Sequence, residues 1–283
     1  MPEGDTVFRA AQTLHKFMAG RRVTRFESAY PALTRIADDH PIVGRTIEAI
    51  SARGKHLLIA FSGDLVLRTH LRMNGSWHIY PAGARWQRPA RDMRVLVCSA
   101  EACAVGFNIP VAELLNGREL EKHSQLRALG PDLLGGTFDL QEAAGRLRAR
   151  GGDPIAEALL NQRVLAGIGN VFKSEILFLA GVYPFTPVSA LTDASLERIL
   201  AISREQLAAN VMGRAQTLSP AWGRRTTRSL DPSAKLWVYS RGGKPCRRCG
   251  EEIQSKKTGP DARVTYWCPA CQRPSASPAV RSS

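Results

Sequence analysis

Residues 246–271 read CRRCGEEIQSKKTGPDARVTYWCPAC, a stretch that begins and ends with two cysteines three positions apart. Two thiolates in a Cys-x2-Cys turn can bind one Zn²⁺, and two such turns separated by 18 residues provide four sulfur ligands. Four protein ligands leave no coordination position for a catalytic water, so the expected zinc ion is structural. The predicted ligands are Cys246, Cys249, Cys268 and Cys271. Two disulfides are the alternative, which a reducing compartment disfavours, and we expect no organic cofactor.

The residues between the two cysteine turns are expected to form a β-hairpin, because a polar centre with a Gly-Pro pair separates two flanks. The flanks place cations beside aromatic residues: Lys256, Lys257, Arg263, Tyr266 and Trp267. We expect the three cations to contact DNA phosphates; for Arg263 the alternative is a solvated surface charge. The aromatic side chains are also candidates for packing the small finger.

The charge of the chain is strongly positive and concentrated toward one end. The formal net charge is +14, and the sequence pI is about 10.1. Residues 213–283 contain 14 Lys and Arg against 4 Asp and Glu, so this quarter of the chain carries +10 of the total. Such a bias favours a polyanionic partner, nucleic acid first. A basic surface that serves solubility or binds an acidic protein is the alternative.

The sequence has no segment typical of membrane or secreted proteins. No apolar run approaches the roughly 20 residues that a membrane-spanning helix needs. The first residues, Met-Pro-Glu-Gly-Asp, lack the basic and apolar parts of a secretory signal. We therefore expect a cytoplasmic protein without a membrane partner, acting as a monomer. Cys98 and Cys103 lie in apolar stretches and are expected to be reduced, buried packing residues.

The first part of the chain predicts a helix followed by short strands. Apolar residues recur with a 3.6-residue period over residues 5–19, with Asp5 or Thr6 as the N-cap and Gly20 as the terminator. From Arg22 to about Val111, short stretches rich in β-branched and apolar residues alternate with turn signals, and residues 62–64 (Ser-Gly-Asp) predict a hairpin. The pattern indicates a β-sandwich fed by an N-terminal helix, over residues 1–125.

The second part is helical, so the fold class is α+β with several domains. Helices are expected at 139–149, 154–161, 171–180 and 193–211, within a domain of residues 130–215. Leu165-Ala-Gly-Ile-Gly-Asn170 separates two of them, and its glycines permit a turn that exposes backbone N–H groups where a phosphate can bind; a plain helix–helix corner is the alternative. Residues 213–236 are a predicted linker, 237–273 the zinc finger and 274–283 a disordered tail.

The N-terminus carries a chemically useful group. Met1 precedes the small residue Pro2, so we expect its removal and a secondary amine at the mature N-terminus. At pH 7 about a tenth of such α-amino groups are neutral, against roughly one in a few thousand for lysine. Attack of this amine on C1′ of a deoxyribose gives a cationic iminium, from which strand scission by elimination can follow. Glu3 is placed to act as general acid toward the sugar ring oxygen.

Five segments occur in an order that resembles the formamidopyrimidine-DNA glycosylase and endonuclease VIII family. They are MPEGDTVFRAA at 1–11, RGKHLL at 53–58, HLRMNG at 70–75, GIGN at 167–170 followed by Glu175, and Arg263 leading into CPACQ at 268–272. The resemblance spans nearly the whole chain. It implies a β-sandwich domain, a helix-two-turn-helix domain and a C-terminal zinc finger, with damaged DNA bound between the domains.

The resemblance also implies roles for single residues. Pro2 is the expected nucleophile and Glu3 the general acid. Lys55 matches the family's strand-loop lysine, which assists elimination or holds the DNA backbone; without the resemblance it is a solvated loop cation. Asn170 and Arg263 match the residues that hold the phosphates beside the flipped nucleotide, and Arg263 is also linked to δ-elimination.

Base removal requires extrusion of the nucleotide, and such enzymes insert a side chain into the vacated space. Met73 lies where the family carries an apolar wedge, with Arg72 and Asn74 beside it and His70 also expected at the DNA. The alternative for Met73 is a core methionine of a strand.

Two departures from the family pattern bear on activity. Many members read Pro-Glu-x-Pro-Glu, whereas here Thr6 replaces the second glutamate and cannot relay a proton as a carboxylate does. This puts base excision in doubt more than the lyase step, which needs chiefly the amine. The pair Asn161-Gln162 stands where Asp-Gln is common, a smaller change.

The expected function is therefore a bifunctional DNA glycosylase and abasic-site lyase of base excision repair that cleaves the strand by β,δ-elimination. The Pro-Glu-Gly opening and the Gly75-x-Trp77 ending lean toward endonuclease VIII and thus toward oxidised pyrimidines. A lyase-only or noncatalytic DNA-binding protein is the alternative, motivated by Thr6. A zinc-finger module that recruits repair or replication proteins is a third.

Overall fold

The computed structural model describes residues 2–211, 223–229, 231, 233–259 and 261–274. The chain divides into two compact units, the first built on residues 1–129 with 211–220 and the second on 130–210 with 221–283. We call them the sandwich unit and the helix-finger unit and describe each by itself. Within the described residues, no helix is long and apolar enough to cross a membrane.

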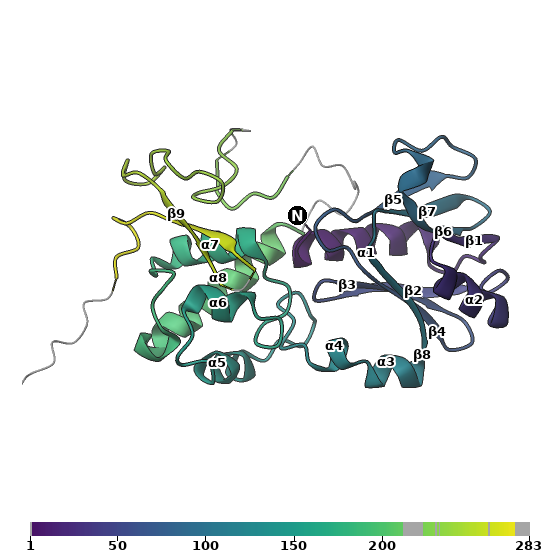
Figure 1. Cartoon of the computed structure of the whole chain (residues 1–283), viewed down its shortest axis with the longest axis horizontal. Coiled ribbons are helices and arrows are strands. Elements are labelled where there is room, and N and C mark those ends of the chain that lie inside the picture. Colours follow the sequence, from purple (N-terminus) through teal and green to yellow (C-terminus); the bar gives the residue numbers. More distant parts are fainter. Residues whose placement is uncertain (1, 212–222, 230, 232, 260, 275–283) are drawn as a thin grey trace, which may run out of the picture. The chain divides into compact units, whose positions relative to one another are not determined.

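The sandwich unit contains one long helix and two four-stranded antiparallel sheets, which confirms the predicted sandwich (Figure 1). One sheet has the order β1-β6-β7-β5 and the other β2-β3-β4-β8. The hairpin predicted at residues 62–64 joins β3 to β4. The strands are β1 (Arg25–Ser28), β2 (Ile47–Arg53), β3 (His56–Phe61), β4 (Leu65–His70), β5 (Ser76–Pro81), β6 (Met93–Cys98), β7 (Ala102–Phe107) and β8 (Val111–Asn116). The helices are α1 (Gly4–Met18), α2 (Pro31–Asp39), α3 (Gly117–Lys122) and α4 (Ser124–Arg127), with a short 3-10 turn at Ala90–Asp92.

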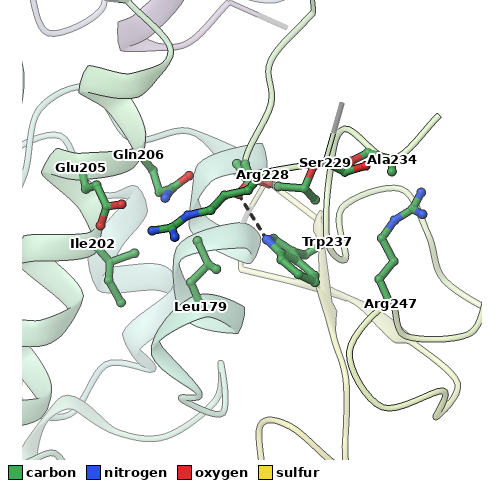
Figure 2. Close-up of a pocket in the computed structure, with 11 residues that line it drawn as sticks. Leu179, Ile202, Glu205, Gln206, Arg228, Ser229, Ala234, Trp237 and Arg247 are labelled. Carbon is green, nitrogen blue, oxygen red and sulfur yellow. Dashed lines mark hydrogen bonds between the residues drawn. The ribbon is translucent and has the colours of Figure 1, made fainter. Parts of the chain in front are cut away.

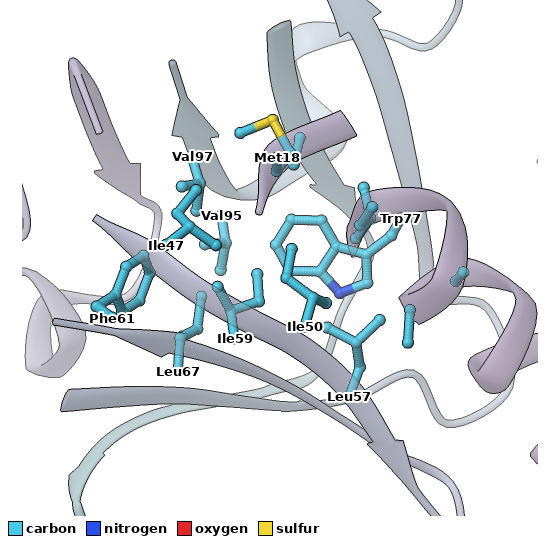
Figure 3. Packing of buried hydrophobic residues seen from close by; sticks show 14 of the residues in the cluster. Met18, Ile47, Ile50, Leu57, Ile59, Phe61, Leu67, Trp77, Val95 and Val97 are labelled. Carbon is cyan, nitrogen blue, oxygen red and sulfur yellow. The ribbon is translucent and has the colours of Figure 1, made fainter. Parts of the chain in front are cut away.

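The core of this unit lies between the sheets and beneath α1, which contacts β2 and β3 of one sheet and β5 and β7 of the other. Figure 3 shows Met18 of α1 packed with aliphatic side chains from strands of both sheets. Trp77 is 2% exposed, and its indole Nε1–H donates to Thr69 Oγ1 at 3.1 Å. The core therefore buries a large polar-tipped side chain without leaving its donor unsatisfied.

The beginning of α1 differs from the sequence prediction. The helix starts at Gly4, and its N-cap is Glu3, whose carbonyl oxygen accepts the N–H groups of Thr6 and Val7. The prediction of Asp5 or Thr6 as N-cap was wrong, because Asp5 already lies inside the first turn, where a negative charge is favourable. The consequence is that Pro2 and Glu3 lie directly at the helix start.

Cys98 and Cys103 also differ from the prediction. They pair directly across β6 and β7, and their sulfurs form a disulfide. Five positions apart in sequence, they sit at the two ends of a tight turn, where an antiparallel register brings side chains onto one face. The prediction that they are free packing residues was wrong because it considered burial and not register.

The helix-finger unit is built on α5 (Leu140–Arg148), α6 (Ile155–Leu160), α7 (Asn170–Ala180) and α8 (Asp193–Ala209), close to the predicted helices. Nearly every residue of α7 is buried, so this helix lies at the centre of the unit. It ends at Gly181, which has a φ of +71° in the left-handed region that favours glycine. The finger hairpin follows as β9 (Gln254–Thr258) and β10 (Arg263–Trp267), as predicted.

A buried carboxylate fixes the segment that leads from α8 to the finger. Glu175 of α7 is fully buried, and its oxygens accept the backbone N–H groups of Trp237, Val238 and Tyr239 at 2.8–2.9 Å. The Thr226 hydroxyl also donates to it. Phe178 of α7 packs in the same cluster as Val238 and two of the finger cysteines. The finger is therefore anchored to α7 by both polar and apolar contacts.

Two histidines pack against each other on β3 and β4. His56 and His70 are paired in the strand register, with ring centroids 4.7 Å apart. Burial lowers the pKa of His56 to about 3, and the charge of Arg68 adds to the shift. Burial lowers the pKa of His70 to about 4, helped by the charges of Arg72 and Lys55. Both rings are therefore neutral at pH 7 in the folded protein.

These shifts predict a pH-dependent stability. Unfolded histidines bind protons near their ordinary pKa of 6.5 and the folded ones do not, so the free energy of unfolding falls as pH drops below about 6.5. Each histidine contributes up to about 1.4 kcal/mol per pH unit. Urea denaturation between pH 7 and pH 5 measures the slope, and His56→Asn should reduce it by one histidine's share. The exposed His40→Asn is the control, and a flat wild-type profile across this range would contradict the burial argument.

Candidate functional site

The start of α1 places the predicted nucleophile beside the predicted acid. Pro2 is half-buried, whereas Glu3 and Asp5 have 0% exposure. Thr6, the residue that departs from the family pattern, donates its hydroxyl to the Asp5 carboxylate at 3.2 Å. A secondary amine adjacent to a carboxyl group held away from water can supply nucleophilic attack and proton donation at one place.

Lys55 lies in the two-residue turn between β2 and β3. Gly54 precedes it with a φ of +59°, which suits a tight hairpin turn. Lys55 is half-buried, and its charge helps to lower the pKa of His70. Lys55 is therefore near enough to His70 for its charge to act on the ring, and both residues belong to the sandwich unit.

The loop between β4 and β5 carries the predicted wedge. Met73 is 62% exposed, so the alternative of a core methionine is wrong, and Arg72 and Asn74 beside it are also exposed. The loop is tight: Gly75 N–H donates to the Leu71 carbonyl at 2.9 Å, and a Cβ on Gly75 would lie 2.5 Å from that oxygen. Only glycine fits this position.

His70 has a defined tautomer in this loop. The backbone N–H of Arg72, whose φ is +48°, donates to His70 Nδ1 at 3.1 Å. With its pKa lowered to about 4, the neutral ring must carry its proton on Nε2. His70 can therefore offer a neutral N–H donor to a phosphate oxygen.

Asn170 begins α7 and lies against the finger hairpin. Its Nδ2 donates to the Val264 carbonyl at 3.0 Å, and its Oδ1 accepts from Lys173 Nζ at 2.7 Å. Residues 164–170 are buried, so the turn is less exposed than the sequence prediction held. The Gln162 side chain bonds to Gly167 and Ile168, and the hairpin contacts Asn170. The structure thus brings Asn170 next to Val264, the neighbour of Arg263.

Arg263 begins β10 and is 40% exposed, with an ion pair to Asp261 at 2.9 Å. Opposed residues of an antiparallel pair share a face, so Arg263 shares the hairpin face of Lys256, and Lys257 lies on the other. The two lysines therefore do not form one phosphate-binding face. Lys256 Nζ also lies 5.8 Å from the centre of the Phe185 ring.

Sequence reasoning missed Lys173. Its ammonium contacts Asn170, and Lys173 and Arg263 both line a pocket of about 220 Å³ beside the hairpin. The only available signal was a lysine inside the otherwise apolar stretch Val171-Phe-Lys-Ser-Glu-Ile-Leu177.

A larger pocket of about 620 Å³ lies elsewhere in the helix-finger unit (Figure 2). Leu179, Ile202 and Trp237 give it apolar walls, and Glu205, Arg228 and Arg247 are among its polar lining. The Trp237 indole N–H donates to the Thr226 carbonyl at 3.2 Å. None of the predicted site residues lines this pocket.

The four cysteines of the finger form one cluster with free thiols, so the disulfide alternative was wrong. Their sulfurs lie within 4.8 Å of one another, with neighbouring pairs at 3.4–4.0 Å. Four Zn–S bonds of about 2.3 Å in a tetrahedron place sulfurs about 3.8 Å apart, so the donor set fits zinc. Burial raises the pKa values of Cys268 and Cys271, whereas the Glu251 backbone N–H lowers that of Cys249. A divalent cation would stabilise all four as thiolates.

Comparison with known proteins agrees with this arrangement. Three family profiles match in order: the formamidopyrimidine-DNA glycosylase N-terminal domain over residues 1–110, its H2TH domain over 129–220, and the zinc finger found in FPG and IleRS over 243–274. A probable endonuclease 8 2 of Streptomyces coelicolor is 42% identical, over 99% of this chain and 96% of that protein. The DNA-(apurinic or apyrimidinic site) lyase Nei2 of Mycolicibacterium smegmatis is 37% identical, over 96% of this chain and 99% of that protein.

Among solved structures, the Lactococcus lactis formamidopyrimidine-DNA glycosylase bound to DNA with an abasic site has a TM-score of 0.80 and 25% identity. The match covers 96% of this chain and 100% of that one. With three family domains in order and relatives above 30% identity over nearly the full length, the chain belongs to the formamidopyrimidine-DNA glycosylase and endonuclease 8 family of DNA-repair glycosylases and lyases.

Proposed function

We propose that the chain excises oxidised bases, pyrimidines in particular, and cleaves the resulting abasic site through an iminium at Pro2. The observation that carries the proposal is the start of α1, where the half-buried Pro2 adjoins the fully buried Glu3. The preference for pyrimidines rests on the resemblance to endonuclease 8, the name of the 42% identical relative. Removal of Met1 is part of the proposal, because only a terminal proline nitrogen is an amine.

The proposed chemistry has four steps. The Pro2 nitrogen attacks C1′ of the damaged nucleotide, the base leaves with the electrons of its bond to C1′, and the proton of the nitrogen passes to the departing base. Glu3 donates a proton to the ring oxygen, so the sugar opens as the new bond becomes an iminium. The iminium withdraws electrons, so C2′ loses a proton and the 3′-phosphate is expelled; a second elimination, assisted by Arg263, expels the 5′-phosphate.

The remaining site residues would hold the DNA. Lys55 and neutral His70 donate to backbone phosphates near the lesion, and exposed Met73 fills the space that the flipped nucleotide leaves. Arg72 and Asn74 flank that wedge. Asn170 and Arg263, which belong to the helix-finger unit, would bind DNA phosphates. Lys256 and Lys257 would add charge to the finger, which one Zn²⁺ holds through its four cysteines.

The proposed partner is damaged DNA, bound by a monomer whose sandwich domain carries the amine and whose helix-two-turn-helix domain and finger carry the phosphate ligands. The alternative of a noncatalytic protein is not favoured, because a relative 37% identical is named a DNA-(apurinic or apyrimidinic site) lyase. The second alternative, a lyase that does not excise bases, is motivated by Thr6 and requires an experiment of its own.

Borohydride trapping tests the iminium. Hydride reduces an iminium to a stable amine, so the wild type should form a covalent adduct with a duplex that contains one abasic site. A Gly-Ser extension ahead of Pro2 turns its nitrogen into an amide, which is not nucleophilic, and should abolish the adduct; intact mass confirms loss of Met1 in the wild type. An equal yield of adduct from the extended protein would exclude Pro2 as the nucleophile.

The same assay separates base excision from lyase activity. A duplex with one oxidised pyrimidine gives an adduct only after the base has left, so the proposed function expects adducts on both duplexes. An adduct on the abasic duplex alone would leave a lyase. A panel of duplexes, each with one defined lesion, then identifies the base.

Salt dependence tests the phosphate role of Arg263. Each phosphate contact contributes about 0.9 to the slope of log affinity against log salt on duplex DNA. Arg263→Ala should therefore lower the slope by about one unit. Arg146→Ala is the matched control, because Arg146 is 41% exposed and ion-paired with Glu142 at 2.8 Å, close to the 40% of Arg263. An unchanged slope for Arg263→Ala, or an equally large decrease of the slope for Arg146→Ala, would argue against a specific phosphate contact of Arg263.

A further inference from the structure

Lys173 is a buried cation at the centre of the helix-finger unit. It lies one turn into α7 and is 1% exposed. Its Nζ lies 2.7 Å from Asn170 Oδ1, 2.7 Å from Thr265 Oγ1 and 3.5 Å from the Val264 carbonyl oxygen. Burying an ammonium group is costly unless hydrogen bonds replace its water. These three acceptors, one on α7 and two on β10, provide that replacement.

The ammonium group determines which way the Asn170 amide faces. An ammonium group only donates, so the atom of Asn170 that faces Lys173 must be the oxygen. Nδ2 then lies on the other side, where one of its hydrogens bonds to the Val264 carbonyl at 3.0 Å. An amide nitrogen carries two hydrogens. The second hydrogen of Nδ2 can donate to an acceptor such as a phosphate oxygen. A flipped amide would instead turn its oxygen toward the phosphate, and the two oxygens would repel each other.

The same ammonium group joins α7 to the strand that begins with Arg263. Thr265 is fully buried and lies two residues after Arg263 on the same face of β10. The Tyr266 N–H donates to Ser174 Oγ of α7 at 3.4 Å, which supports the same junction. Lys173 therefore touches both the side chain that begins α7 and the backbone that carries Arg263.

We infer that Lys173 is a positioning residue for phosphate binding: it orients the Asn170 amide and fixes the spacing between Asn170 and Arg263. Lys173 acts through Asn170 and β10 and does not itself contact DNA, since it is 1% exposed. The inference rests on the proposed phosphate role of Asn170.

A double-mutant cycle tests it, with zinc-loaded full-length protein and a duplex carrying an uncleavable abasic-site analogue. Lys173→Met keeps the side-chain length without a donor, and Asn170→Ala removes the amide. Each should weaken binding by roughly tenfold, the value of one charge-assisted hydrogen bond. The double variant should lose less affinity than the product of the two single losses, because Lys173 has no amide left to orient and only its contacts with β10 remain to be lost. Multiplied losses in the double variant would overturn the inference.

Controls separate positioning from stability. Leu177→Ala removes a fully buried side chain of the same helix, so it should lower stability to urea without changing affinity for the folded protein. If it weakens binding as much as Lys173→Met, positioning is excluded. Lys173→Gln, which keeps a donor, should recover part of the affinity and replaces Lys173→Met if that variant does not fold; no recovery would also count against the inference.

The inference and the proposed function fail in different ways. If the wild type forms no borohydride adduct, the iminium mechanism is excluded, but the double-mutant cycle of DNA affinities can still be interpreted. Normal binding by Asn170→Ala would remove the phosphate role on which the inference rests. Normal trapping and weakened Asn170→Ala binding, together with wild-type affinity for Lys173→Met, would refute the inference alone.

Discussion

The Glu175 carboxylate is the interaction on which the helix-finger unit depends. It accepts three consecutive backbone N–H groups and the Thr226 hydroxyl, with no exposure to solvent. The described residues between 223 and 239 form neither helix nor strand, so their course is fixed by contacts of this kind. Removal of the carboxylate would leave several buried donors unsatisfied, at a cost of about 1–3 kcal/mol each. The finger follows this segment directly in the chain, so the contacts of Glu175 also help to fix the position of the finger on α7.

One helix thus assembles groups from distant parts of the chain. Asn170, Lys173 and Glu175 lie within six residues of α7, and their partners lie 51–94 residues further along. The proposed reagent, the Pro2 amine, lies in the sandwich unit. In the proposed mechanism the sandwich unit supplies the amine and its acid, and α7 orients the proposed phosphate-binding residues of the other unit.

The sequence predicted what short-range patterns determine. The spacing of the four cysteines predicted their cluster, the alternating and 3.6-residue patterns predicted the sandwich and the helices, and the glycine-containing hairpin turns followed from local chemistry. The Cys98–Cys103 disulfide was missed because it depends on strand register. The roles of Lys173 and Glu175 were missed because a buried charge can be recognised only with its partners, which are remote in sequence. The local signal for Pro2, a small residue directly after Met1, is common among proteins, so its proposed role rests chiefly on the resemblance.

Single-turnover kinetics of Glu175→Gln on an abasic-site duplex tests this division of work most directly. Glutamine keeps the shape but turns one acceptor into a donor that faces other donors, which loosens the segment before the finger. The enzyme concentration for half-maximal cleavage should rise about tenfold or more, while the limiting rate of β-elimination at saturating enzyme should stay near that of the wild type. An unchanged half-maximal concentration with a collapsed limiting rate would contradict it.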